Sequence, residues 1–222
     1  MKNKKLKALE LDVEAVVRTH PELEPLMYKN IPVGLEGIID IFDLDDVKRG
    51  SFQIQVDFSA RYPNGFPSLR ELSKLIPREI DRHIYDNGNC CVTVLQKQII
   101  ESKRGITIER YFKDYVVPFL ANQIHFEEYG KWANEEYKHG YAGQVQFYQE
   151  TTKSTDLSII LKAIKIIIDS TKFSRNEKCF CNSEIKYKKC HEQSISDLRV
   201  IGKEQLKSDW DQINEILEEE KI

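Results

Sequence analysis

The sequence lacks an excess of charge of either sign. Its 222 residues include 33 lysines and arginines and 36 aspartates and glutamates, for a net charge of −3. So balanced a charge creates no global electrostatic field that would hold a nucleic acid or an anionic membrane. We therefore expect protein partners rather than nucleic acid, and any polyanion binding to be local.

Long apolar runs are also missing. The most apolar stretch, Leu157 to Ile168, is interrupted by Lys162 and Lys165 and is too short to cross a bilayer. No signal peptide of the usual charged, apolar and small-residue pattern opens the chain. We expect a cytoplasmic protein without membrane contact, in which cysteines act as ligands or thiols because disulfides rarely persist there.

Cysteine is scarce, with five residues, and three of the five fall in one short motif. The pattern Cys-x-Cys-x8-Cys-His is made by Cys179, Cys181, Cys190 and His191. Three thiolates and an imidazole are the ligands that a tetrahedral structural zinc takes, so we predict a Zn²⁺ site here. We expect metal loss to unravel mainly residues 173–192. Cys90 and Cys91 are then the two cysteines left outside the motif, so we look for a reactive thiol in this adjacent pair.

Periodicity predicts an α+β fold. Apolar residues recur at helical spacing up to Pro21, and then alternate over residues 33–41 and 52–58, as in paired antiparallel strands. A further short strand is expected within residues 69–76. Helices are predicted from Thr107, a candidate N-cap, with a kink or restart at Pro118, and again over residues 157–168. Residues 127–143 are expected to form a loop, and Ser208 to cap the last helix.

The segment before the cysteine pair is a tight turn. Asp86-Asn87-Gly88-Asn89 leads directly into Cys90, Cys91 and a β-branched run. A cysteine at such a junction can be held rigidly and still be reached by a reactant. Alternation along a strand points the two cysteines in opposite directions, so we expect Cys91 to be the nucleophile and Cys90 to pack.

These elements, in this order, resemble the ubiquitin-conjugating enzyme (UBC) fold. The loop Tyr62-Pro63-Asn64-Gly65-Phe66-Pro67 looks like that family's Tyr-Pro-x-x-x-Pro loop, and the segment 87–95 is similar to its Asn-Gly-x-Ile-Cys-Leu-x-Ile-Leu active-site segment. The resemblance covers about residues 5–150. It implies that Cys91 is the catalytic cysteine, which carries an acyl group as a thioester.

One departure concerns the His-Pro-Asn tripeptide that the family places before its cysteine. The corresponding residues here are His83-Ile84-Tyr85, so Tyr85 or Asn87 is expected to act where the family uses asparagine, and His83 to orient the site. This departure makes the chain resemble prokaryotic members of the fold. Some of these are encoded in bacterial antiphage operons beside a nucleotidyltransferase that makes cyclic-oligonucleotide signals, which implies an antiviral role. The resemblance thus implies a co-encoded nucleotidyltransferase or a ubiquitin-like substrate as partner.

The cysteine-histidine motif resembles the SEC-C motif, which serves partner docking in other proteins. All four ligand positions are present, but Asn182 and Glu184 replace the two glycines of the pattern. We expect four parts: a ubiquitin-conjugating-like domain at 1–150, a connecting helix at 151–172, the zinc module at 173–195 and a terminal helix at 196–222.

The function predicted is that of an acyl-thioester carrier that forms a covalent intermediate with the C-terminus of a partner protein. The sequence contains no adenylating glycine-rich loop, so the acyl group must arrive already activated. Two alternatives remain open. The same fold could serve as a noncatalytic adaptor for a partner enzyme, or Cys91 could pair with His83 or His139 in a hydrolase.

Overall fold

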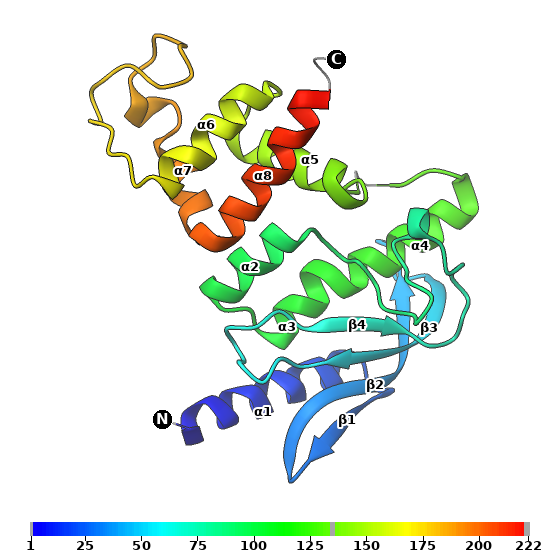
Figure 1. Ribbon diagram of the computed structural model, residues 1–222. Helices are drawn as coiled ribbons and strands as arrows, with labels where there is room; N and C mark the ends of the chain where they lie inside the picture. The colour runs from blue at the N-terminus through cyan, green and yellow to red at the C-terminus, as the bar shows by residue number, and fades with distance from the viewer. Residues whose placement is uncertain (1, 134–135, 220–222) are drawn as a thin grey trace. The chain divides into compact units, whose positions relative to one another are not determined.

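The computed structural model describes residues 2–133 and 136–219. They form two compact units, shown in Figure 1. The first unit comprises Met1–Thr93 and Glu101–Glu136, and the second comprises Val94–Ile100 and Tyr137–Ile222. These two units divide the chain at other residues than the four domain ranges expected from the sequence, which stay a prediction.

The first unit is built on a four-stranded antiparallel sheet in the order β1-β2-β3-β4. The strands are β1 (Leu23–Tyr28), β2 (Ile31–Phe42), β3 (Lys48–Asp57) and β4 (Ser68–Glu71). The predicted pair is confirmed as β2 and β3, in which Leu35 lies opposite Val56 and Ile39 opposite Phe52. All four side chains are buried, so their alternation places one face of the sheet in the core.

Strand β1 was not predicted from the sequence. It pairs with β2 at the edge of the sheet and contains Pro25, which donates no hydrogen bond and is tolerated at an edge. The expected short strand after the Tyr-Pro loop is β4, which ends at Glu71 rather than at Ile76.

Helices pack against this sheet and complete the first core. They are α1 (Lys2–Thr19), α3 (Ile108–Tyr111), the π-helical η2 (Phe112–Val116) and α4 (Val117–Tyr129). The predicted N-cap is confirmed, since the Thr107 hydroxyl accepts a hydrogen bond from the Arg110 backbone N–H at 3.1 Å. The predicted restart is also confirmed, because α4 begins beside Pro118 directly after the π-helical turn.

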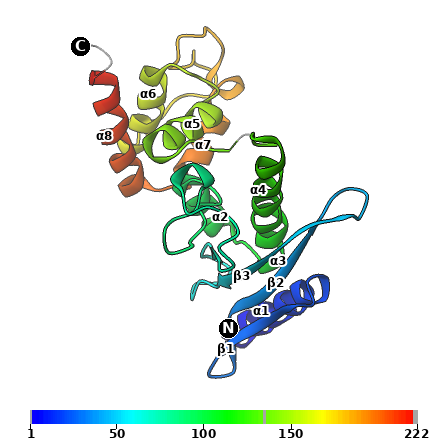
Figure 2. The ribbon, with the colours of Figure 1, turned by 90° about the vertical axis from the view of Figure 1, so that its right-hand side faces the viewer.

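Four helices make up most of the second unit, and Figure 2 shows them grouped together. They are α5 (Gly140–Thr152), α6 (Leu157–Ile168), α7 (Glu192–Arg199) and α8 (Lys203–Glu219). The prediction of Ser208 as a cap was wrong, because α8 begins five residues earlier, after Gly202. The expected loop at 127–143 was too long, since α4 reaches Tyr129 and α5 starts at Gly140; residues 134–135 lie outside the described residues.

Helix α2 (Leu95–Arg104) contributes to both units, since its first residues belong to the second and its last residues to the first. The predicted α+β class is confirmed: an antiparallel sheet with helices, followed by the cysteine-histidine segment. A search of the described helices for one long and apolar enough to cross a membrane found none.

Candidate functional site

The candidate nucleophile lies on a tight hairpin. Ile84 and Cys90 form a bridge across it, and the Cys91 backbone N–H donates to the His83 carbonyl at 2.8 Å. The Tyr85 backbone N–H donates to the Asn89 carbonyl at 2.9 Å and closes the turn. The hairpin therefore fixes the backbone up to the residue that carries the thiol.

Gly88 and Asn87 are required by this turn. Gly88 has φ +84°, and a Cβ at this position would come within 2.6 Å of the Glu71 carbonyl oxygen. The Gly88 carbonyl accepts from the Glu71 backbone N–H at 2.9 Å, which ties the turn to β4. The Asn87 side-chain oxygen accepts from the Asn89 backbone N–H at 3.0 Å, so the role of Asn87 seen here is to shape the turn.

The two neighbouring cysteines differ in environment. Cys90 packs against the first core, and burial raises the pKa of its thiol to about 12. Cys91 is half-buried, and its Sγ lies 3.9 Å from the Thr93 carbonyl oxygen. Its pKa is raised by burial and by the negative charge of Glu136, and is lowered by a hydrogen bond from Tyr85. Both thiols are half-buried and have a raised pKa, and the Tyr85 hydroxyl favours the thiolate of Cys91.

Two groups that act on the Cys91 thiol are a phenol and a carboxylate. Tyr85 is 55% exposed, and its hydroxyl hydrogen-bonds the Cys91 thiol. Glu136 is partly buried, and this burial raises the pKa of its carboxyl group above the ordinary value. The Asn122 amide donates to Glu136 and accepts from the Ala133 backbone N–H at 2.9 Å, which holds the carboxylate in place.

Sequence reasoning missed Glu136 and Asn122, because they stand 45 and 31 positions from Cys91 in the sequence and carry no motif. Asn122 lies inside α4 and Glu136 in the segment that follows this helix, so neither position carried a signal of a site. The predicted residue His83 is buried, with its ring edge-on to Trp132 at 5.9 Å between centroids. His139 belongs to the second unit, at the N-cap position of α5. The catalytic roles assigned to Cys91, His83, Tyr85 and Asn87 stay predictions.

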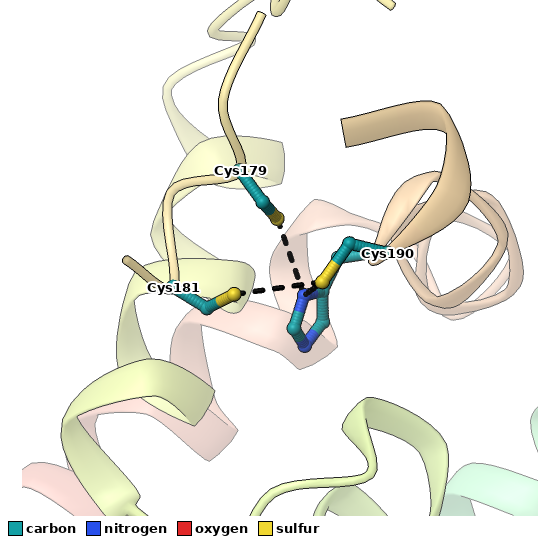
Figure 3. Close-up of side chains that lie close together, drawn as sticks. Cys179, Cys181 and Cys190 are labelled. Atoms are coloured by element: carbon teal, nitrogen blue, oxygen red, sulfur yellow. Dashed lines mark hydrogen bonds between the residues drawn. The ribbon is translucent and has the colours of Figure 1, made fainter. Parts of the chain in front are cut away.

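The four predicted ligands form one cluster in the second unit. Figure 3 shows Cys179, Cys181 and Cys190 converging on an imidazole ring. The His191 Nδ1 lies 3.3 Å from Cys179 Sγ and 3.1 Å from Cys190 Sγ, and Cys181 Sγ lies 3.5 Å from Cys190 Sγ. All four ligand atoms are within 4.8 Å of one another, so the cluster could hold a metal ion.

The other nitrogen of His191 is also engaged. Its Nε2 lies 2.9 Å from the Thr152 carbonyl oxygen at the end of α5, and an N–H at Nε2 leaves Nδ1 free to bind a metal. Burial lowers the pKa of His191 and so favours the neutral ring that a metal ligand requires. Both residues at the expected glycine positions, Asn182 and Glu184, have φ of 61°, so they keep the left-handed conformation that glycine would adopt.

Comparison with protein-family models identifies this segment. Residues 175–193 match the SEC-C motif. The match includes all four clustered ligands and confirms that part of the sequence resemblance. No curated protein matches the chain. No solved structure matches it either, so the likeness of the first unit to ubiquitin-conjugating enzymes stays a prediction.

Proposed function

We propose that the first unit is a ubiquitin-conjugating-like acyl carrier in which the Cys91 thiol forms a thioester with the C-terminus of a partner protein. The observation that carries this proposal is the half-buried thiol on a rigid hairpin, between the Tyr85 hydroxyl and the Glu136 carboxylate. The element order supports it: a first helix, three strands, the Tyr-Pro loop, the fourth strand and then the cysteine hairpin.

In the first step, the Cys91 thiolate attacks the carbonyl carbon of an activated acyl donor and expels the donor's thiolate. The Tyr85 hydroxyl hydrogen-bonds the thiolate before attack and is positioned to donate to the oxyanion that develops. This hydrogen bond offsets part of the burial that otherwise keeps the thiol protonated. Tyr85 would therefore take the role that the family gives to asparagine.

In the second step, an acceptor amine attacks the thioester, an amide forms and Cys91 leaves as a thiolate. The nitrogen must lose a proton as the bond forms, and the Glu136 carboxylate is the nearby group that can accept it. Its raised pKa makes it a stronger base than an ordinary glutamate. The resemblance suggests as acceptor or donor a co-encoded nucleotidyltransferase or a ubiquitin-like protein, in antiviral defence.

One observation favours an adaptor as the second candidate. The pKa of Cys91 is raised, whereas a dedicated nucleophile often has a lowered pKa. A hydrolase is less favoured, because the groups that act on the thiol are Glu136 and Tyr85, while the His83 ring packs edge-on against Trp132.

The test is coexpression with the genomic neighbours, followed by mass spectrometry of the peptide carrying the adduct. We expect a partner C-terminus on Cys91 that thiols and hydroxylamine remove, since they cleave a thioester but not an amide. Cys91→Ser should convert the adduct to a reductant-resistant ester or abolish it, and Cys90→Ser is the matched control that keeps it. A stable partner complex without any adduct supports the adaptor instead, and a cleaved partner without an adduct supports the hydrolase.

For the second unit we propose that the bound metal is zinc in a structural role. Bond lengths of about 2.3 Å to sulfur and about 2.0 Å to nitrogen place the ligand atoms of a tetrahedral site about 3.5 Å apart for a sulfur–nitrogen pair and about 3.8 Å apart for two sulfurs. The closest pairs of the cluster, at 3.1 to 3.5 Å, lie within about 0.4 Å of this spacing. Elemental analysis should find about one equivalent of zinc in the wild type, little in Cys190→Ser, and the full amount in Cys90→Ser. Equal zinc in all three would exclude this site.

A further inference from the structure

The second unit holds a buried carboxylate that the proposed chemistry does not use. Asp209 on α8 is fully buried and accepts hydrogen bonds from three side chains. The Gln205 amide donates at 2.8 Å, the Gln96 amide at 3.1 Å, and the Tyr148 hydroxyl also donates. A buried carboxylate with this many donors is costly to disturb, because each donor would lose its partner in a low-dielectric interior.

This carboxylate is connected to the metal cluster through α5. Tyr148 and Thr152 lie one turn apart on this helix, and the Thr152 hydroxyl donates to the Tyr148 carbonyl at 2.7 Å. The Thr152 carbonyl in turn bonds to Nε2 of His191, whose Nδ1 faces the three cysteines. A metal bound at Nδ1 would fix this ring and, with it, the end of α5.

The carboxylate also binds the start of α2, which follows the cysteine segment along the chain. Gln96 is buried in the first turn of α2, and the second core includes Val94, Ile99 and Ile100 from the same stretch. Val94 follows Thr93, whose carbonyl oxygen lies 3.9 Å from Cys91 Sγ. The residues that continue the chain after the thiol are therefore held by the core that contains metal ligands.

We propose that Asp209 and Gln96 are positioning residues that link the metal cluster to the Cys91 thiol, so that metal occupancy controls the reactivity of Cys91. The link runs from His191 through Thr152, Tyr148, Asp209 and Gln96 to the start of α2. Without the metal, α5 loses its anchor, the start of α2 loosens and the thiol becomes more exposed. The proposal deepens the proposed function, on which its biological meaning rests.

The test measures labelling of Cys91 by N-ethylmaleimide, peptide by peptide, with metal bound and after excess EDTA. The measurement needs no acyl donor, so it tests the effect of the metal on Cys91 even if the proposed function is wrong. We expect EDTA to speed labelling of Cys91 at least about fivefold while Cys90 stays slow, and to speed hydrogen exchange in residues 92–100. Equal Cys91 rates with and without metal would overturn the link. Parallel acceleration of Cys90 would show general unfolding and would also overturn it.

A variant separates coupling from simple destabilisation. Gln96→Met keeps the side-chain shape but removes the hydrogen bond to Asp209, so Cys91 should label fast with metal bound and gain little more from EDTA. Gln193→Met, which removes an exposed hydrogen bond to Asp197 on α7, should behave as the wild type. Independent, fully additive effects of Gln96→Met and EDTA would contradict the link.

Discussion

At the scale of single residues, two opposing influences set the state of the Cys91 thiol. Burial and the Glu136 charge favour the neutral thiol, whereas the Tyr85 hydrogen bond favours the thiolate. The pKa of Cys91 is raised, so burial and charge outweigh the hydrogen bond. In the wild type, the rate of thiol labelling should accordingly rise with pH through a midpoint above that of an ordinary cysteine.

Removal of the Tyr85 hydroxyl should slow the labelling of the Cys91 thiol. Tyr85→Phe removes the hydrogen bond that stabilises the thiolate, so the pKa of Cys91 rises further and the labelling midpoint moves to higher pH. A hydrogen bond of about 1 kcal/mol corresponds to about fivefold slower labelling at neutral pH. Tyr28→Phe, at an exposed tyrosine of β1, is the control that should change nothing.

Neutralising Glu136 should change thiol labelling and acyl transfer to an amine in opposite directions. Glu136→Gln removes the negative charge that raises the pKa of Cys91, so labelling at neutral pH should become faster. Transfer to an amine should become slower, by about a hundredfold or more, because the proton acceptor is lost. Glu24→Gln on β1 serves as control. Unchanged transfer in Glu136→Gln would remove Glu136 from the proposed mechanism.

At the scale of elements, the start of α3 is fixed by two caps. Thr107 is the local cap, and Asp12 of α1 reaches the same helix start across the core. The Asp12 carboxylate accepts from the backbone N–H groups of Ile108 and Glu109 and from the Tyr62 hydroxyl at 2.9 Å. Asp12 thus joins α1, the Tyr-Pro loop and α3.

The two caps should differ in their contribution to stability. Thr107→Ala loses one exposed hydrogen bond, so the free energy of unfolding should fall by about 1 kcal/mol. Asp12→Ala leaves three donors without their acceptor and should cost about 3 kcal/mol. Urea unfolding followed by Trp132 fluorescence, in a Trp210→Phe background, reports on the first unit. Thr107→Ser keeps the cap and should match the wild type; equal losses for both alanine variants would contradict this account.

At the scale of the whole molecule, the two units share α2. Val94, Ile99 and Ile100 pack in the second core, whereas residues from Glu101 onward belong to the first unit. Neither unit is a continuous piece of chain. A boundary placed at residue 150, as expected from the sequence, would separate the start of α2 from most of the core that covers it.

A fragment of residues 1–150 should therefore be incomplete. We expect its β2 and β3 amides to remain protected from hydrogen exchange, while residues 94–100 exchange much faster than in the full chain. The exposed apolar side chains should also bind a hydrophobic dye. Protection at 94–100 equal to that of the full chain would show that residues 1–150 form a self-sufficient domain.

The sequence alone determined those features that depend on residues close together along the chain. The metal ligands lie within 13 residues, the Thr107 cap acts three residues along the chain, and alternation shows in β2 without reference to its partner. Only the tertiary structure placed Glu136 near Cys91 and Asn122 beside Glu136, brought Asp209 to Gln96 and assigned α2 to both units. These contacts join residues 14 to 113 positions apart, and the pairing follows from how whole helices pack, which local periodicity and motif spacing do not encode.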